Sequence, residues 1–362
     1  MNILVVMGTR PEAIKLAPVV WALRRRKRLR TFVCATGQHR EILDQMLRTF
    51  QLKPDYDLAV MRRGQSLDEV TRRVLSALPP VMARVKPGLV VVQGDTTTAL
   101  AAALCATHHR VPVAHIEAGL RSFDPAHPFP EERNRVLIDH LATLHFPPTS
   151  AAKANLAREG IRGAGVVLTG NTVVDALTWA LARSRPIPRA ARGQREVLVT
   201  LHRRESFGKP LESIFRALMT LVRRHPDLVL TYPVHPNPRV VLSAKRLLRH
   251  PRIRLIKPQP YLDFVRLMGQ AEFLITDSGG LQEESISLRK PVLIVRKTTE
   301  RSEVVTAGAG RLVGLNPKKL IDWASRLLKS QALYRRMRRA PNPFGDGKAA
   351  ERIASAIAGF KP

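Results

Sequence analysis

Three acidic residues lie at or near the ends of predicted buried strands in this strongly basic chain. Asp95 follows the apolar run of residues 89–92, and Glu117 follows the run of residues 111–114. Glu131 comes shortly afterwards, at the start of a predicted helix. The carboxyl ends of parallel strands meet at one edge of a sheet, where ligands bind in open α/β folds. Three carboxylates converging on one cleft would indicate proton-transfer chemistry.

Each of these carboxylates also has an ordinary structural interpretation. Asp95 precedes a run of threonines and could cap the helix that follows. Glu117 could pair with Arg121, and Glu131 could pair with Arg135 one helical turn later. Three such residues on neighbouring crossovers favour the chemical interpretation, and a catalytic carboxylate can also form an ion pair.

The first predicted turn between a strand and a helix offers a phosphate contact. Residues 8–11 do not form a GxGxxG sequence, so they are not a dinucleotide fingerprint. They still provide a helix N-terminus, and Arg10 and Lys15 add positive charge. A helix cap with two solvated cations explains the same residues equally well.

A second turn of this kind follows the predicted strand of residues 273–276. Ser278, Gly279 and Gly280 are small enough for backbone N–H groups to approach a phosphate closely. Glu284 lies one turn into the next predicted helix, where a carboxylate can accept ribose hydroxyl groups. An ordinary strand-to-helix turn is the alternative.

Two histidines and an arginine in the second half are further candidates. His202 follows the predicted strand of residues 197–200 and could act as a general acid or a phosphate donor. His235 lies among prolines, which fit either a functional loop or a merely stiff one. Arg301 follows the predicted strand of residues 292–295 and is a candidate anion contact.

The 362 residues exceed what one hydrophobic core usually fills, so two domains are expected. Strands alternate with helices up to about residue 183, and the same alternation restarts after a linker at residues 184–194. We therefore predict an α/β protein with two doubly wound, Rossmann-like domains facing a cleft. The predicted domains are residues 1–183 and 184–346. The predicted strands are 3–7, 31–36, 89–92, 111–114, 144–146, 166–169, 197–200, 228–232, 254–256, 273–276 and 292–295.

The formal net charge of +31 raises the question of a nucleic-acid partner. The densest basic run, residues 24–28, ends the first predicted helix, where cations suit the helix dipole. No aromatic-interleaved basic stretch accompanies it, so we expect an anionic substrate and no specific nucleic acid. The two cysteines form no metal-ligand pattern, and no leader or membrane-spanning run is apparent, which favours a cytoplasmic protein.

Many ordered blocks along the chain resemble the non-hydrolysing UDP-N-acetylglucosamine 2-epimerases of bacteria. The resemblance covers nearly the whole sequence. The matching blocks are GTRPEAIKLAP from Gly8, GQHREILDQML from Gly37, QGDTTTALA from Gln93, HIEAGLRS from His115, PEERNR from Pro130, GNTVVDAL from Gly170, HRRESFG from His202, YPVHPNP from Tyr232, TDSGGLQEE from Thr276, TTER from Thr298 and NPFGDGKAAERI from Asn342.

The resemblance implies a fold of the GT-B type, with a last helix, at about residues 347–362, that packs back on the first domain. It implies reversible C2 epimerisation of UDP-N-acetylglucosamine to UDP-N-acetylmannosamine by elimination and re-addition of UDP. No NAD, other cofactor or metal is expected, and the enzyme is expected to be a homodimer that supplies polysaccharide synthesis.

The resemblance also implies roles for individual residues. Asp95, Glu117 and Glu131 form the acid/base set, Arg135 orients or stabilises them, and His202 assists the leaving diphosphate. The UDP-binding positions are Arg10, Lys15, Gln259, Phe264, Ser278, Gly279, Gly280, Glu284 and Arg301. A second, activating substrate site is implied at Gln38, Arg203 and His235.

The sequence departs from the family pattern at a few positions. Leu201 stands where a small residue is usual, Ile286 and Ser302 replace prolines, and Arg289 replaces a glycine. Three other functions stay open from the residues: a hydrolysing epimerase, a GT-B glycosyltransferase, and a non-catalytic nucleic-acid-binding protein. Three clustered carboxylates and the intact HRRE block starting at His202 favour the non-hydrolysing epimerase.

Overall fold

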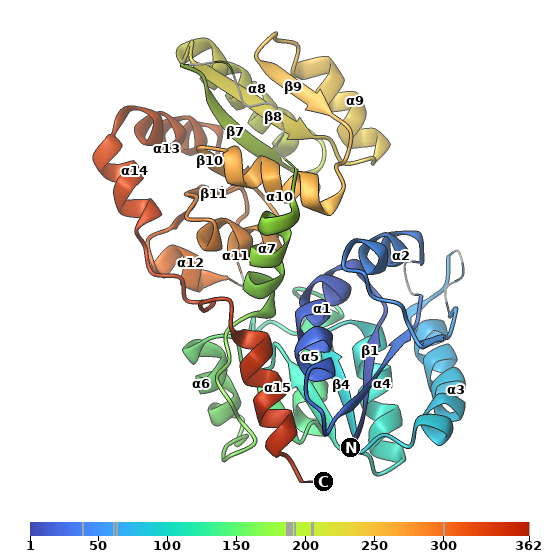
Figure 1. Ribbon diagram of the computed structural model, residues 1–362. Helices are drawn as coiled ribbons and strands as arrows, with labels where there is room; N and C mark the ends of the chain where they lie inside the picture. The colour runs from blue at the N-terminus through green and yellow to red at the C-terminus, as the bar shows by residue number, and fades with distance from the viewer. Residues whose placement is uncertain are drawn as a thin grey trace. The chain divides into compact units, whose positions relative to one another are not determined.

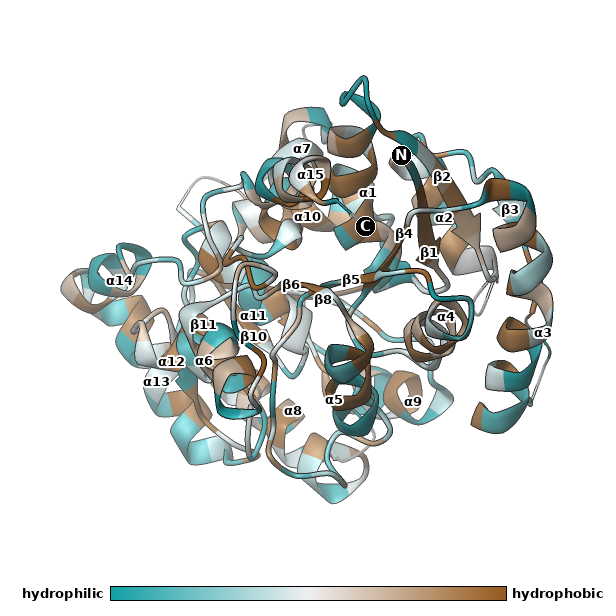
Figure 2. Ribbon diagram, turned by 90° about the horizontal axis from the view of Figure 1, so that it is seen from below, coloured by the Kyte–Doolittle hydropathy of each residue, from teal (hydrophilic) through white to brown (hydrophobic). Residues whose placement is uncertain are grey.

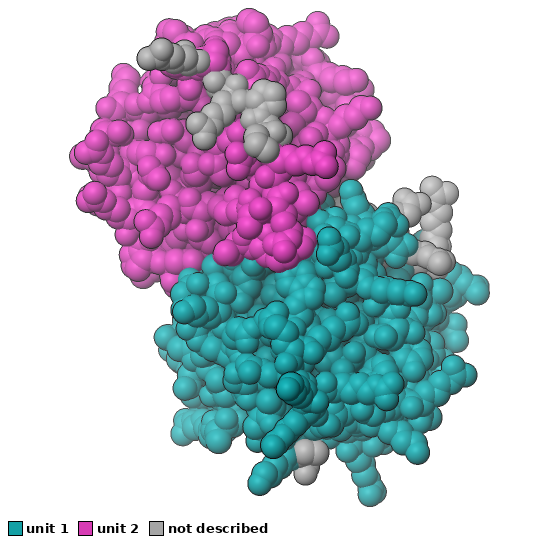
Figure 3. All heavy atoms as spheres, in the orientation of Figure 1, with its two compact units in different colours: residues 1–176, 344–362 teal, residues 177–343 magenta. Residues whose placement is uncertain are grey.

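The chain forms two compact units, coloured separately in Figure 3. The structure is a computed structural model that describes residues 1–37, 40–60, 62, 64–185, 191, 193–203, 206–299 and 301–361, with the backbone alone at residues 40–42. Unit 1 comprises residues 1–176 and 344–362, and unit 2 comprises residues 177–343. The domain limits expected from the sequence, at residues 183 and 346, stay a prediction.

Unit 1 is built on a parallel six-stranded sheet in the order β3-β2-β1-β4-β5-β6. Its strands are β1 (Asn2–Met7), β2 (Arg30–Ala35), β3 (Tyr56–Asp57), β4 (Leu89–Gln93), β5 (Val113–Ile116) and β6 (Leu144–Phe146). Its helices are α1 (Arg10–Arg24), α2 (Arg40–Thr49), α3 (Leu67–Val85), α4 (Thr97–His108), α5 (Glu131–Leu141), α6 (Ser150–Arg158) and α15 (Ala349–Gly359). Helix α7 (Thr172–Arg183) begins in unit 1 and ends in unit 2.

Burial on both faces explains why the central strands read as continuous apolar runs. Every residue of β4 is buried, and β1, β4 and β5 are mostly brown in Figure 2. Helix α3 instead has apolar residues every three to four positions, with Val74 and Leu78 against the core. Side-chain hydroxyls of Ser66 and Thr96 accept backbone N–H groups and so cap α3 and α4.

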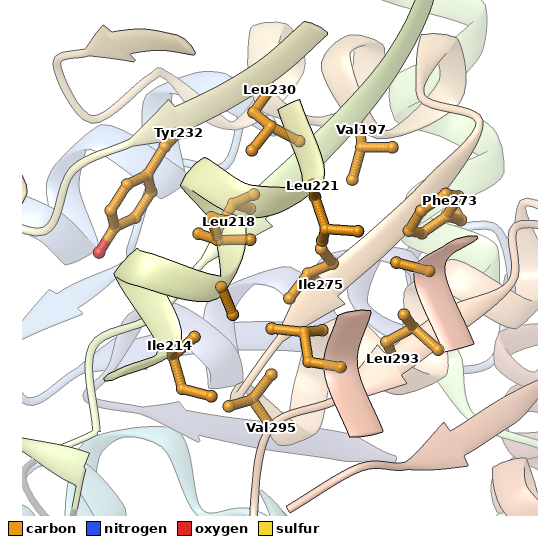
Figure 4. Close-up of a cluster of buried hydrophobic side chains, with 14 of the residues drawn as sticks. Val197, Ile214, Leu218, Leu221, Leu230, Tyr232, Phe273, Ile275, Leu293 and Val295 are labelled. Atoms are coloured by element: carbon orange, nitrogen blue, oxygen red, sulfur yellow. The ribbon is translucent and has the colours of Figure 1, made fainter. Parts of the chain in front are cut away.

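Unit 2 repeats the architecture of unit 1, with the sheet order β12-β11-β10-β7-β8-β9. Its strands are β7 (Arg195–Thr200), β8 (Leu228–Pro233), β9 (Ile253–Ile256), β10 (Phe273–Thr276), β11 (Val292–Ile294) and β12 (Gly310–Leu312). Its helices are α8 (Lys209–Arg224), α9 (Pro238–Leu247), α10 (Tyr261–Gln270), α11 (Gly279–Ser287), α12 (Ser302–Thr306), α13 (Pro317–Lys329) and α14 (Gln331–Arg338). Figure 4 shows part of its core, where Leu230 and Ile275 of the sheet gather with Leu218 of α8.

Both sheets have the strand order of a doubly wound fold, which fixes where a ligand is expected. In such sheets the binding crevice lies beyond the carboxyl ends of the two strands where the order reverses. These strands are β1 and β4 in unit 1, and β7 and β10 in unit 2. The two turns proposed for phosphate binding, and the segments carrying Asp95 and His202, follow these strands.

The last helix packs on unit 1, against α1 (Figure 1). The carboxylate of Asp175 accepts the first two N–H groups of α15, from Ala349 at 3.2 Å and Ala350 at 3.0 Å. Glu351 of α15 binds the guanidinium groups of Arg25 and Arg26. Part of the densest basic run is thus neutralised within unit 1.

The fold class predicted from the sequence is confirmed, with local corrections. The strand expected at residues 111–114 is β5, two residues later, because Pro112 cannot donate an N–H to the ladder. The strand expected at residues 166–169 is only a single bridge from Val166 to His145. Within the predicted linker, residues 186–190 and 192 lie outside the described part of the chain. No described helix is long and apolar enough to cross a membrane.

Candidate active site

The carboxylate of Glu117 accepts hydrogen bonds from three side chains at the candidate site of unit 1. Lys15 on α1 places its Nζ 2.6 Å from Oε1 and 2.7 Å from Oε2. Gln93, the last residue of β4, donates to Oε2, and Asn171 donates to Oε1 at 3.2 Å. All four residues are buried, and these donors stabilise the charge of the carboxylate.

The pairing of Glu117 with Arg121, the structural alternative from the sequence, is wrong. Arg121 instead binds Asp139 at 2.8 Å and Glu159 at 2.5 Å. Glu117 has a left-handed backbone, with φ of 68°, which turns its side chain away from the path of the strand. Backbone of this kind is costly for a residue other than glycine and concentrates at functional sites.

Asp95 is held by two consecutive residues of α5. Arg135 binds its carboxylate, and the side-chain amide of Asn134 donates to its backbone carbonyl at 2.9 Å. Asp95 is not the cap of α4, because Thr96 takes that position. Arg135 also lies 3.3 Å from Glu132, so the expected pair with Glu131 is wrong.

Glu131 begins α5, one turn before Arg135 and on the same side of the helix. Its side chain is partly exposed, and within the described residues no hydrogen bond or ion pair engages its carboxylate. Glu131 can therefore accept a proton without first breaking an ion pair.

The turn between β1 and α1 is held by Glu12, a residue that the sequence motifs did not indicate. One carboxylate oxygen of Glu12 accepts the N–H groups of Gly8 and Thr9, and the other accepts the hydroxyl of Thr96 at 2.6 Å. Burial raises the pKa of Glu12, and its hydrogen bonds offset this only in part. Arg10 in this turn is half-buried, and no described residue binds its guanidinium.

In unit 2 the strand order reverses between β7 and β10, and the loops after these two strands are bonded to each other. Asp277 accepts the backbone N–H groups of His202 at 2.8 Å and Arg203 at 2.9 Å. The other carboxylate oxygen lies 3.1 Å from Nδ1 of His202. Asp277 thus fixes the backbone at His202 and lies close to its imidazole, although this contact does not have hydrogen-bond geometry. The His202 side chain keeps about two fifths of its surface exposed (39%) and can reach a ligand.

His235 from the loop after β8 stacks on His202, with ring centroids 5.5 Å apart and planes at 17°. Burial, together with the neighbouring His202, lowers the pKa of His235. Of the three residues expected at an activating site, Arg203 and His235 both lie beside His202. Gln38 lies outside the described residues.

The N-terminus of α11 is open to an anion. Ser278 is the N-cap residue, but its hydroxyl caps no N–H group, and a side chain added at Gly280 would meet no atom within 4 Å. The backbone of Ser278 is fixed by a bond from its N–H to the Thr276 hydroxyl at 3.0 Å. Aligned N–H groups at a helix start bind phosphate readily.

The remaining predicted nucleotide contacts belong to the same unit. Glu284 is buried on α11, 3.4 Å from the hydroxyl of Tyr261. Arg301 binds Glu283 at 2.7 Å. Phe264 is a half-buried residue of α10, and Gln259 donates to the carbonyl of Lys257.

The departures from the family pattern have separate structural settings. Leu201 is buried in the core of unit 2, so its bulk points away from solvent. Ile286 is buried within α11, and Ser302 begins α12. Arg289 is exposed and has a left-handed backbone with φ of 55°, a conformation that suits the glycine usual there.

Comparison with known proteins agrees with this arrangement. Residues 21–358 match the sequence family described as UDP-N-acetylglucosamine 2-epimerase. The UDP-N-acetylglucosamine 2-epimerase of Yersinia pestis is 50% identical over 369 residues, covering 99% of this chain and 98% of the relative. The crystal structure of UDP-GlcNAc 2-epimerase from Neisseria meningitidis bound to UDP-GlcNAc superposes with a TM-score of 0.93 at 41% identity, covering 99% of this chain and all (100%) of that chain.

A structure of S. aureus MnaA with UDP is similar as well, with a TM-score of 0.90 at 44% identity, and covers 98% of this chain and 95% of that one. Two doubly wound units of this kind define a fold of the GT-B type. The chain belongs to the UDP-N-acetylglucosamine 2-epimerase family.

Proposed function

We propose that the protein is a non-hydrolysing epimerase that interconverts UDP-N-acetylglucosamine and UDP-N-acetylmannosamine at C2. The main support is the arrangement of Asp95, Glu117 and Glu131 around the carboxyl ends of β4 and β5, in a chain of this family. The relatives that match over their whole length bear the same enzyme name, and one neighbour is described as bound to UDP-GlcNAc.

The chemistry explains why carboxylates and cations are both needed. The C2 hydrogen is not next to a carbonyl, so its direct removal by a base is difficult. Cleavage of the C1–O bond places positive charge at C1 and makes the C2–H acidic. The base then takes the C2 proton while UDP leaves with the bonding pair, which gives 2-acetamidoglucal. Re-addition of UDP at C1 with protonation of C2 from the opposite face completes the reaction.

Unit 1 carries out the proton transfers. Glu131 is the carboxylate that no described side chain engages, which suits it to exchange a proton. Arg135 binds the carboxylate of Asp95, and Lys15 binds the carboxylate of Glu117. Because fixed charges in a buried site need no reorganisation during the reaction, these pairs stabilise the charge that develops on the sugar.

Unit 2 binds the nucleotide. The N-terminus of α11 and the guanidinium of Arg301 attract the diphosphate, and Glu284 accepts ribose hydroxyls. His202, whose backbone N–H binds Asp277, donates to the departing UDP oxygen. The family resemblance also supports Arg10 as a UDP-binding position.

A proton NMR assay in heavy water tests this function directly. The purified protein is incubated with UDP-N-acetylglucosamine and no added cofactor. We expect the manno isomer to appear with deuterium at C2 and with little free sugar. Accumulation of UDP with free N-acetylmannosamine would instead identify a hydrolysing epimerase. If neither product forms, and sugar is transferred only to an added acceptor, the protein is a glycosyltransferase.

The family resemblance also leads us to propose a cytoplasmic homodimer whose product enters polysaccharide synthesis. Sedimentation analysis of the purified protein measures its oligomeric state. The proposed activating site beside His202 and His235 predicts a rate that rises more steeply than first order with substrate. Hyperbolic kinetics at all substrate concentrations would contradict the activating site.

A further inference from the structure

His115 is a fully buried histidine with a hydrogen-bond acceptor at each ring nitrogen. Its Nδ1 lies 2.6 Å from a carboxylate oxygen of Asp139, and its Nε2 lies 2.7 Å from the carbonyl oxygen of Gly94. The ring thus bridges the side chain of Asp139 and the backbone of Gly94.

Both His115 and Arg121 bind the carboxylate of Asp139. Burial opposes its charge, but His115 and Arg121 outweigh burial, so the pKa of this carboxyl lies below its ordinary value. Its second oxygen accepts the N–H of Gly119 at 3.0 Å and a guanidinium N–H of Arg121 at 2.8 Å. Each ring nitrogen of His115 and each carboxylate oxygen of Asp139 therefore has a partner within unit 1.

The backbone groups that bind this pair, the carbonyl of Gly94 and the N–H of Gly119, lie close in sequence to the proposed acid/base residues. Gly94 immediately precedes Asp95, and Gly119 lies two residues after Glu117. The N–H of Gly94 also donates to the carbonyl of Ile116 at 3.0 Å, so the loops after β4 and β5 are tied together twice.

The backbone at this point needs such support. Glu117, Gly94 and Gly119 all have positive φ, at 68°, 71° and 80°. A side chain at Gly119 would lie 2.2 Å from the carbonyl of Ala152, so the turn is also closely packed. A left-handed glutamate persists only where its surroundings hold it in place.

We propose that His115 is a positioning residue for the epimerisation, holding the loops of Asp95 and Glu117 in one fixed relationship. The inference rests on the proposed function. It assigns a role to a histidine whose ring nitrogens bind Asp139 and Gly94 and none of the three acid/base carboxylates. Its effect is on geometry, and displacing a reacting group by about 1 Å can cost roughly 100-fold in rate.

The test compares two buried histidines that face each other across β5 and β6. His145 pairs in register with His115, and its Nε2 lies 2.7 Å from the backbone carbonyl of the same Asp139. Its Nδ1 has no hydrogen-bond partner among the described residues, so its ring forms no hydrogen bond to either loop. His115→Asn retains a donor near the position of Nδ1 and loses the one to Gly94, and His145→Gln serves as the matched control.

We expect His115→Asn to lower kcat by about 100-fold while KM changes by less than about threefold. His145→Gln should lower Tm by about as much as His115→Asn does. Its kcat should stay within about threefold of that of the original protein. His115→Gln, which keeps a donor near Nε2 toward Gly94, should recover part of the lost kcat. Circular dichroism, recorded with the thermal unfolding curves, reports whether each variant is folded.

Two results overturn the inference. One is a kcat for His115→Asn within about threefold of the original protein, and the other is an equal loss of kcat in His145→Gln. If His115→Asn does not fold, the comparison of His115→Gln with His145→Gln decides by the same criterion. The original protein is assayed first by NMR, so failure of the proposed function is seen separately, as absence of epimerisation before any variant is made.

Discussion

The ammonium group of Lys15 lies between the two oxygens of the Glu117 carboxylate, at 2.6 and 2.7 Å, with both residues buried. The two residues are 102 positions apart in the chain, and they join the start of α1 to the end of β5. Breaking a buried ion pair by removing one partner leaves an uncompensated charge and commonly costs about 3–5 kcal/mol.

We therefore expect Lys15→Met to lower the free energy of unfolding by about 3 kcal/mol and to reduce epimerisation. The double variant Lys15→Met/Glu117→Gln should be more stable than Lys15→Met alone, because it leaves no unpaired charge. Urea unfolding of the two single variants and the double variant gives the coupling energy. Strictly additive effects would show that the contact contributes nothing.

Conversion of Glu131 to glutamine should remove activity without affecting the fold. Its side chain has no partner among the described residues, so stability should change by less than about 0.5 kcal/mol. Loss of one proton-transfer group should lower kcat by about 100-fold to 10,000-fold.

Asp95→Asn and Glu117→Gln should also abolish turnover, with some loss of stability. Asp68→Asn, at an exposed position of α3, is the control. Normal turnover in any two of the three site variants would refute the acid/base assignment.

Asp175 gives the docking of α15 a defined pH dependence. Burial raises the pKa of its carboxyl from 3.8 to about 6, in spite of the hydrogen bonds from Ala349 and Ala350. Because the pKa is higher in the folded state, protonation favours folding. Its contribution is fully present below pH 3.8 and is lost as the pH rises through about 6.

The stability difference between the original protein and Asp175→Ala should therefore shrink with rising pH. The change between about pH 4.5 and about pH 7.5 should be up to about 2 kcal/mol. Chemical unfolding at several pH values measures it. A difference that stays constant, or that grows toward neutral pH, would show that the carboxyl is not shifted in this direction.

Arg289 is expected to be less favourable than glycine at its position. A left-handed backbone costs a residue with a side chain about 1–2 kcal/mol, and the greater freedom of glycine in the unfolded chain offsets about 0.5–1 kcal/mol of that. Arg289→Gly should thus raise stability by about 0.5–1 kcal/mol. Arg335→Gly within α14 should lower stability by about 1 kcal/mol, the opposite sign. Thermal unfolding distinguishes the two.

Continuous apolar runs made most of the fold predictable from the sequence. Strands such as β1, β4 and β7 are buried on both faces, so their residue types alone identify them. Short or mainly polar elements gave no such signal. Strands β3 and β12 have two and three residues, and α6 buries only Ala152 and Leu156.

The sequence indicated candidate residues for the site but not their contacts. Asp95, Glu117 and His202 were found because each follows a recognisable strand. The partners Lys15 of Glu117 and Asp277 of His202 lie 102 and 75 residues away, and no local pattern encodes such a pairing. Only the folded sheets bring them together.

The position of α15 also has a consequence for synthesis of the protein. Ribosomes release the chain from its N-terminus, and domains generally fold as units while this happens. Residues 177–343 emerge as an uninterrupted stretch, whereas unit 1 must wait for residues 344–359 before α1 acquires its neighbour. The portion translated first is consequently the portion completed last, and α1 leaves the ribosome with an apolar surface still uncovered.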